Sequence, residues 1–226
     1  MTKFPHFNFV LWGGFLLAVN AGFVNALGIL SLLHQAVSHL TGTISNLGIA
    51  AAQNNWDELF KTGNIILFFF LGSVLSGLII GDSHLRFGRR YGVTLLLQSL
   101  ALFAAIYFLG QGLRRAEYML ALACGLQNGM ATSYSGAVVR TSHMTGIVTD
   151  LGIMVGQFLR YRQPLPTWRL WVLLSLLAGF LVGGGTAVPA FHYLGFNALL
   201  LSAVAMALSG IAYIAYHQWQ RGKVGE

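Results

Sequence analysis

The sequence predicts an all-α polytopic membrane protein built from two homologous halves. Of its 226 residues, 56% are hydrophobic and only 8% are charged, with a mean hydropathy of +0.68, whereas soluble domains carry about 25% charged residues. A sixteen-residue phrase also occurs twice, at positions 38–53 and 142–157. These features indicate a single integral membrane domain over residues 1–226, with one repeat at about 8–112 and a second at about 113–220.

Six apolar runs are long enough to cross a bilayer, whose hydrocarbon core of about 30 Å requires roughly 20 helical residues. They are read at about Phe9–Leu33, Thr62–Gly81, Tyr91–Gly110, Tyr118–Val139, Trp168–Val188 and Phe196–Trp219. No small-residue cleavage site follows the first run. Asn25 within this run corresponds in a repeated motif to Asn128, which lies far from the N-terminus. The first run is therefore expected to be a retained span rather than a secretory signal.

The repeated phrase places polar residues and glycines where a membrane protein tolerates them least. Ser38-His-Leu-Thr-Gly-Thr-Ile-Ser-Asn-Leu-Gly-Ile-Ala-Ala-Ala-Gln53 returns as Ser142-His-Met-Thr-Gly-Ile-Val-Thr-Asp-Leu-Gly-Ile-Met-Val-Gly-Gln157, with eight identical positions at an offset of 104 residues. A second echo, Gly22-Phe-Val-Asn25-Ala against Gly125-Leu-Gln-Asn128-Gly, has an offset of 103. An internal duplication of one structural unit is the simplest explanation of both repeated motifs.

The predicted number of spans depends on whether each repeated phrase crosses the membrane. From Thr43 to Gln53 there are 11 residues, about 17 Å of helix at 1.5 Å per residue, which is too short to cross. Each phrase is therefore predicted to be a broken or re-entrant half-helix, with three full spans per half and six overall. The alternative is a polar but complete span, which gives eight.

The distribution of basic residues favours six spans. With a cytoplasmic N-terminus, six spans place ten Lys and Arg residues inside and three outside, whereas eight spans place nine inside and four outside. Cytoplasmic loops carry the excess of positive charge, so the net charge of +7 reflects topology rather than a nucleic acid partner. An odd number of spans per half would invert the second half relative to the first, an architecture of many secondary transporters.

The candidate binding residues come from the two phrases and from the asparagines upstream. The His-x-Thr-Gly segments would lie at the N-terminus of each short helix, where free N–H groups and the helix dipole favour electronegative atoms. The candidate substrate-binding residues are His39, Thr41, Gly42, Asn46, His143, Thr145, Gly146, Asp150, Asn25 and Asn128. The threonines have an alternative role as helix caps, and the asparagines have one as hydrogen-bond partners of a neighbouring helix.

Asp150 is the leading candidate for proton coupling, together with His143. It is expected to be the only acid inside the apolar body, where an ionised carboxylate costs several kcal/mol unless it is paired or faces water. The other acids, in loops, at loop edges or at the terminus, are Asp57, Glu58, Asp82, Glu117 and Glu226. The alternative is an ion pair near Arg140 in a cytoplasm-facing loop. Asn46 holds the equivalent position in the first half and is neutral.

These motifs resemble the YoaK-like family of bacterial inner-membrane proteins, which is also catalogued as a domain of unknown function. The resemblance is carried by Gly22-Phe-Val-Asn25-Ala, Ser38-His-Leu-Thr-Gly42, Gly125-Leu-Gln-Asn128 and Val139-Arg-Thr-Ser-His-Met-Thr-Gly-Ile-Val-Thr-Asp150-Leu-Gly. It implies about six spans in the bacterial inner membrane and supplies no substrate. Many members carry aspartate where this chain has Asn25, so a role that depends on an acidic group in the first half is not carried over to this chain.

The sequence predicts a small-solute secondary transporter or permease, with a midplane site between the two Ser-His-x-Thr-Gly elements. A channel or a non-transporting scaffold is the alternative, and an intramembrane enzyme ranks behind both because the chain has no Gly-x-Ser-x-Gly or His-Glu-x-x-His motif. The expected partners are the bilayer, a small solute or ion and a second copy of the chain. No cofactor is expected. A metal site is not predicted either, since the spacing of His39, His143 and Asp150 is no known ligand motif.

Overall fold

The regular structure of the described residues is entirely helical, which confirms the predicted all-α class. The computed structural model describes residues 7–30, 38, 40–81, 89–135, 140–162 and 165–224. The elements are α1 (Phe7–Leu30), α2 (Leu40–Ala52), α3 (Trp56–Ile80), α4 (Arg89–Gly110), α5 (Arg115–Ser135), α6 (Met144–Tyr161), α7 (Thr167–Leu194), the 3₁₀ helix η1 (Gly195–Ala198) and α8 (Leu199–Val224).

Six long helices occupy the six predicted apolar runs, and α2 and α6 hold the repeated phrases. Among the described residues, four stretches are long and apolar enough to cross a membrane, namely α1, α3, α4 and the continuous stretch Thr167–Trp219 that contains α7 and most of α8. The helix α5 is less apolar because Glu117, Gln127 and Asn128 interrupt it. With 13 and 18 residues, α2 and α6 are about 20 and 27 Å long. Their re-entrant arrangement stays a prediction.

Local chemistry explains where several helices begin and end. The side chain of Asn55 accepts a hydrogen bond from the backbone N–H of Glu58 at 3.2 Å, so it caps α3, whose first turn also carries two acids that suit the helix dipole. Gly81, which ends α3, has a φ of 62°, a conformation that glycine adopts without steric cost.

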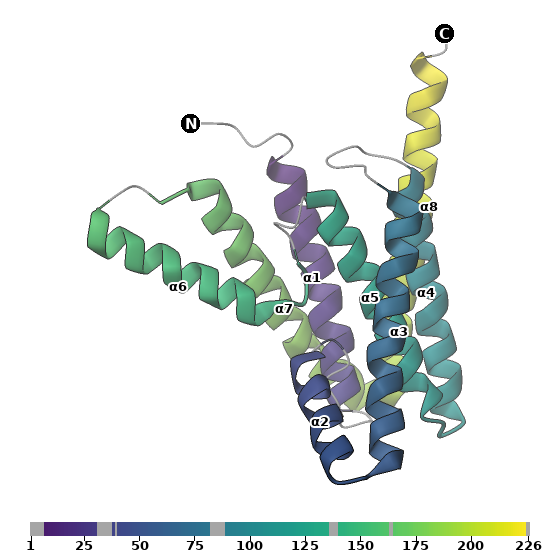
Figure 1. Cartoon of the computed structure of the whole chain (residues 1–226). Coiled ribbons are helices and arrows are strands. Elements are labelled where there is room, and N and C mark those ends of the chain that lie inside the picture. The colour runs from purple at the N-terminus through teal and green to yellow at the C-terminus, as the bar shows by residue number, and fades with distance from the viewer. Residues whose placement is uncertain are drawn as a thin grey trace.

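The long helices associate as three pairs. In Figure 1, α1 and α7 run side by side in one direction, whereas α3 and α5 run side by side in the opposite direction. The third pair, α4 and α8, is antiparallel, and α4 also packs on α5. Each pair therefore joins a helix from the first half of the chain with one from the second half.

Glycines bring the backbones of the paired helices into contact. A methyl group added at Gly22 of α1 would overlap the carbonyl oxygen of Phe180 in α7, and one added at Gly125 of α5 would overlap that of Phe69 in α3. Gly22 and Gly125 are the first residues of the second repeated motif. The reciprocal contacts are made by Gly183 against Val19 and by Gly72 against Leu122. Small residues allow membrane helices to approach this closely.

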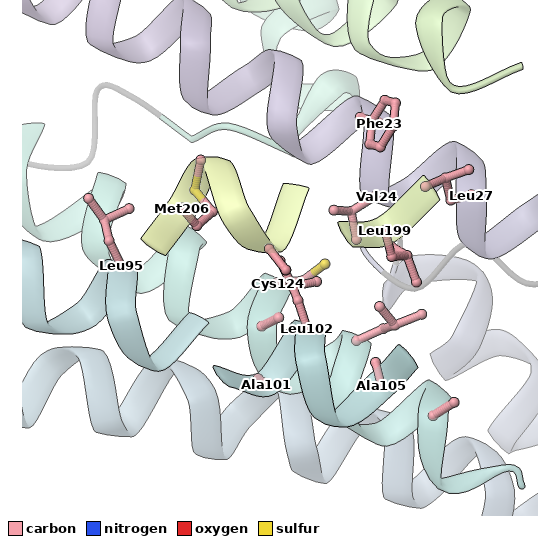
Figure 2. Packing of buried hydrophobic residues seen from close by; sticks show 14 of the residues in the cluster. Phe23, Val24, Leu27, Leu95, Ala101, Leu102, Ala105, Cys124, Leu199 and Met206 are labelled. Carbon is pink, nitrogen blue, oxygen red and sulfur yellow. The ribbon is translucent and has the colours of Figure 1, made fainter. Parts of the chain in front are cut away.

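Part of the interior is filled by apolar side chains. Figure 2 shows Val24 and Leu27 of α1 close to Leu199 of α8, with Leu102 and Ala105 of α4 nearby. Each of these five side chains is at most 2% exposed. We call this group, together with Leu120 of α5, the sealed core.

The two short helices differ in their packing. α2 lies along α3, whereas α6 leaves the bundle and contacts α7 over a shorter length (Figure 1). Only Ile147 and Met154 of α6 are buried, and they belong to a cluster with Val172, Leu173 and Leu176 of α7.

Replacing Gly125 by alanine is expected to destabilise the protein, because the new methyl group meets a helix backbone that cannot rotate away. Overpacking of this kind costs about 1–3 kcal/mol, and Gly22→Ala should behave alike. Thermal unfolding in detergent measures the effect. The matched control is Gly77→Ala in α3, where the added methyl meets no atom within 4 Å. An equal melting temperature for Gly125→Ala and Gly77→Ala would contradict the close contact.

Candidate functional site

A chamber of about 230 Å³ lies between α1, α4, α5 and α8, at the end of the bundle where α1 and α4 begin. Among the described residues, its lining is apolar except for the hydroxyl groups of Tyr91, Ser209 and Tyr213, and none of these residues is charged. The rim includes Phe9 and Leu16 of α1, which are 46% and 63% exposed. The chamber thus connects the interior with the surface of the bundle.

A buried polar layer, consisting of Asn20, Gln98, Gln127 and Ser202, lies at the inner end of the chamber. Each member stands three or four residues, one helical turn, deeper than a residue that lines the chamber. The pairs are Leu17 and Asn20 on α1, Leu95 and Gln98 on α4, Met130 and Gln127 on α5, and Met206 and Ser202 on α8. The four polar side chains are between 2% and 7% exposed.

Gln127 is the centre of this layer. Its Oε1 accepts hydrogen bonds from Asn20 Nδ2 at 2.7 Å and from Gln98 Nε2 at 2.6 Å. Its Nε2 donates to the carbonyl oxygen of Leu17 at 2.7 Å and to Thr141 Oγ1 at 3.1 Å. These bonds use all four hydrogen-bonding positions of the amide, so Gln127 connects three helices with the start of the second phrase.

The orientation of Gln127 leaves one acceptor of the layer unused. A backbone carbonyl only accepts, so the Gln127 nitrogen must face Leu17, and its oxygen must face Gln98. Gln98 therefore presents its nitrogen to Gln127, and its own Oε1 has no hydrogen-bond partner. A small cavity of about 10 Å³ borders Gln98, Gln127 and Asn128, which is room for about one water molecule.

In both repeats an asparagine of a long helix is hydrogen-bonded to the serine that starts the phrase, although the direction of the bond differs. Ser38 Oγ donates to Asn25 Oδ1 at 2.8 Å, and the Ser38 backbone N–H also donates to it at 3.3 Å. In the second half, Asn128 Nδ2 donates to Ser142 Oγ at 2.6 Å, and Thr141 Oγ1 donates to Asn128 Oδ1 at 3.3 Å. Asn25 and Asn128 thus serve as anchors, which explains why the two motifs are repeated together.

The other predicted binding residues lie on the two short helices. Thr41, Gly42 and Asn46 are exposed on α2, and His143 and Thr145 are exposed at the start of α6. Gly146 is half-buried beneath the ring of His143. His39 lies outside the described residues.

The structure does not bring the two phrase helices together. In the described part of the chain, α2 packs on α3 and α6 on α7, with no extensive contact between α2 and α6. The predicted residues therefore form two separate groups, and only the second is linked to the polar layer, through the bond between Thr141 and Gln127.

The structure corrects the prediction that Asp150 is the only acid within the apolar body. Asp150 Oδ2 forms an ion pair with Arg169 Nη2 of α7 at 2.9 Å, and their side chains are 40% and 45% exposed. The alternative interpretation, an exposed ion pair, describes it better, although the partner is Arg169 rather than Arg140. The pair lines a pocket of about 220 Å³ between α6 and α7, which Gln157 also lines.

Among the described residues the buried acid is Glu117, in the first turn of α5 and ahead of the predicted span Tyr118–Val139. It is 3% exposed, and its Oε2 has no hydrogen-bond partner. Burial raises the pKa of Glu117, and the positive charges of Lys61 and Arg114 offset this in part. Glu117 precedes the buried Leu120 by three residues, so the helical repeat places both side chains on the same, buried face of α5.

Sequence reasoning also missed most of the polar layer. Asn20, Gln98 and Ser202 are not among the candidates, and Gln127 appears only within the motif Gly125-Leu-Gln-Asn128. The signal was available, because a lone amide inside an apolar run must find a partner. The rule holds for Asn20 and Gln98 as much as for Asn25 and Asn128.

Comparison with known proteins assigns the chain to a family. The model of the family described as "Protein of unknown function (DUF1275)" matches residues 13–212. The chain belongs to this family. It is also 23% identical over 209 residues to the UPF0700 transmembrane protein YoaK of Bacillus subtilis (strain 168), an alignment that covers 88% of this chain and 91% of the relative. No solved structure matches. The predicted YoaK-like resemblance is confirmed, and the chain is a membrane protein of this DUF1275 family.

Loss of Gln127 should cost far more stability than loss of Gln98. Gln127→Leu leaves the donors on Asn20 and Gln98 without partners, at about 1–3 kcal/mol for each buried group. Gln98→Leu removes only one of the two donors to Gln127 and also removes an unpaired oxygen. Thermal unfolding of both variants in detergent measures the difference, and equal losses would contradict the central position of Gln127.

Glu117→Gln should stabilise the protein at neutral pH. Because the folded-state pKa of Glu117 is raised, the folded protein retains this proton to higher pH than the unfolded chain, whose Glu pKa is about 4.3. Stability supplied by the protonated carboxyl is therefore present below about pH 4 and lost as the pH rises through the folded-state pKa. Melting temperatures of variant and wild type should converge at pH 4 and separate by pH 7. A constant difference across this range would contradict the assignment.

Proposed function

We propose that this protein is a small-solute secondary transporter, or permease, whose solute binds in the chamber and against the polar layer. One observation carries the proposal: a buried polar layer separates an open chamber from the sealed core, within the same four helices. Above the layer these helices leave space, and below it Leu27, Leu102 and Leu199 close the interior. A transporter needs a binding site that is open to one side of the membrane at a time.

The proposed architecture is a pair of inverted repeats, each with three long helices and one phrase helix. The opposite directions of α1 and α5, and of α3 and α7, support it (Figure 1), as do the repeated motifs with offsets of 103 and 104 residues. The glycine contacts also support it, because Gly22 of α1, which packs against α7, corresponds to Gly125 of α5, which packs against α3. Inverted repeats allow alternating access, since one repeat can rock against the other around a fixed site.

The differing packing of the two phrase helices fits this mechanism. The helix α2 is closed against α3, whereas α6 is splayed from α7. Two copies of one plan in two conformations are what an alternating-access cycle requires, because the copies exchange conformations when access changes sides. The bonds of Thr141 to Gln127 and of Ser142 to Asn128 would transmit a movement of α6 to the polar layer.

The chamber is proposed to face the cytoplasm of a bacterial cell. It lies at the end of the bundle where α1 and α4 begin, the end at which the positive-inside rule places Arg89, Arg90 and both termini. In the inner membrane this would be an inward-facing state. Asp150 and His143 remain the proposed coupling groups, and protonation of Asp150 would weaken its ion pair with Arg169 across the α6–α7 wedge.

Uptake into proteoliposomes tests the proposal with a pooled library of small metabolites and mass spectrometry of the lumen. Met206→Trp fills the chamber and is expected to abolish the accumulation of any solute taken up by the wild type. Leu208→Trp, on the same helix but 62% exposed, is the matched control and should retain uptake. Asp150→Asn should remove the pH dependence of uptake.

If wild-type liposomes accumulate no solute beyond empty ones, the permease assignment fails, and a scaffold role becomes the better account. Flux that does not saturate would instead indicate a channel. Unchanged uptake and unchanged pH dependence in Asp150→Asn would refute the coupling role alone.

A further inference from the structure

We infer that the sealed core is the closed counterpart of the chamber, and that Glu117 is the proton-binding group that keeps it closed. This assignment rests on the proposed function, because it names the second access path of the transporter and the ligand, a proton, that controls this path. Three observations carry it: the correspondence between residues of the two regions, the position of Glu117 in that correspondence, and the charges that surround Glu117.

The chamber and the sealed core use equivalent residues of α1 and α5. An offset of 103 residues relates the two Gly-x-x-Asn motifs. With this offset, Leu17, which lines the chamber, corresponds to Leu120 in the sealed core. In the other direction, Leu27 of the sealed core corresponds to Met130, which lines the chamber. Each pair therefore has one member in the open region and one in the closed region.

The helices α4 and α8 contribute opposite ends to the two regions. The chamber is lined by Tyr91 in the first turn of α4 and by Tyr213 in the second half of α8. The sealed core takes Leu102 from the second half of α4 and Leu199 from the first turn of α8 (Figure 2). Rocking of one repeat against the other, which closes the chamber, would therefore open the sealed core.

Glu117 holds the position in this correspondence that Gly14 holds at the chamber. It lies one helical turn before Leu120 and is 3% exposed. Its Oε2 has no hydrogen-bond partner in the described part of the chain. Opening of the sealed core would expose this turn of α5 to water, in the way that the present chamber borders Gly14. The carboxyl group is therefore dry in the closed arrangement and hydrated in the open one.

The cations near Glu117 already have carboxylate partners. Lys61 Nζ of α3 lies 3.5 Å from Glu58 Oε2, and Arg114 Nη1 lies 2.7 Å from Asp57 Oδ2. The other titratable groups at this end of α5 and at the adjoining end of α4 are Arg115, Tyr118 and Tyr107. Among the described residues, the last two turns of α1 and of α4 carry no charge. An ionised Glu117 would therefore be a buried charge without a counter-ion of its own, whereas a protonated one is neutral.

The proton links pH to the direction of opening. Burial raises the pKa of Glu117 in the closed arrangement, and Lys61 and Arg114 offset this in part. Hydration in the open arrangement returns the pKa toward the ordinary value of about 4.3. Because the closed arrangement binds the proton more tightly, acid favours closure, and opening is favoured as the pH rises through the pKa of the closed state. The equilibrium changes by up to about tenfold for each unit that separates the two pKa values.

Cysteine accessibility of the full-length protein in proteoliposomes tests the inference, with Cys124 replaced by alanine. The reporters are Leu27→Cys in the sealed core and Met130→Cys at the corresponding position of the chamber. Each is labelled with N-ethylmaleimide at pH 5 and at pH 8, and the ratio of the two rates cancels the common effect of pH on thiol reactivity. We expect the ratio of sealed core to chamber to rise several-fold from pH 5 to pH 8.

Variants assign this response to Glu117. Glu117→Gln keeps a neutral amide at every pH, so its ratio should stay at the low value of the wild type at pH 5. Lys61→Met removes a positive charge that lowers the pKa of Glu117, so the response should move to higher pH. Arg115→Gln, in the same turn but exposed, is the matched control and should keep the wild-type response. Leu102→Cys is a second reporter for the sealed core, and melting temperatures report on the folding of each variant.

A wild-type ratio that does not change with pH overturns the inference, and so does a response that Glu117→Gln retains. Displacement of the response to lower pH by Lys61→Met would contradict the sign of the linkage. Labelling that depends on Glu117 and pH, without uptake of any solute, keeps the two access paths and rejects the transporter. Solute uptake by a protein whose labelling ratio is independent of pH keeps the transporter and rejects the role of Glu117.

Discussion

The amide of Gln127 must satisfy four hydrogen-bonding positions inside an apolar bundle, and the arrangement of the helices around it follows from that requirement. An unpaired buried polar group costs about 1–3 kcal/mol, and water is scarce at this depth. Asn20 and Leu17 of α1, Gln98 of α4 and Thr141 ahead of α6 supply the partners. These bonds fix the height of α1 and α4 relative to α5, and with it the level at which the open chamber ends and the sealed core begins.

Close helix packing is the second constraint, because the polar layer forms only if backbones approach one another. Glycines permit this where α1 crosses α7 and where α5 crosses α3, and the two crossings use residues that correspond in the repeated motifs. Lipid offers little hydrophobic drive for helix association, so van der Waals contact and interhelical hydrogen bonds carry it. The repeated Gly-x-x-Asn motif combines both devices: its glycine admits a neighbouring helix and its asparagine anchors the phrase.

The six long helices were predictable because length and apolarity are local properties of the sequence. The polar layer was harder to predict, since Asn20 meets Gln127 across 107 residues and Ser202 across 182, and only tertiary structure decides such pairings. Repetition alone does not make the phrases a binding site. Ser38 and Ser142 attach each phrase to a long helix, whereas Thr41, Asn46 and His143 are exposed. Asp150 looked buried because its run is apolar, but α6 is splayed from the bundle and exposes it to Arg169.

The central claim is that the polar layer divides the interior into an open and a closed half. Leu17, Asn20 and Val24 lie three and four residues apart on one face of α1, at the chamber, at the layer and in the sealed core. Cysteines at positions 17 and 24, introduced after Cys124, the single native cysteine, is replaced by alanine, can be labelled with N-ethylmaleimide in proteoliposomes. We expect rapid modification of Leu17→Cys and protection of Val24→Cys. Equal rates at the two positions would contradict the division.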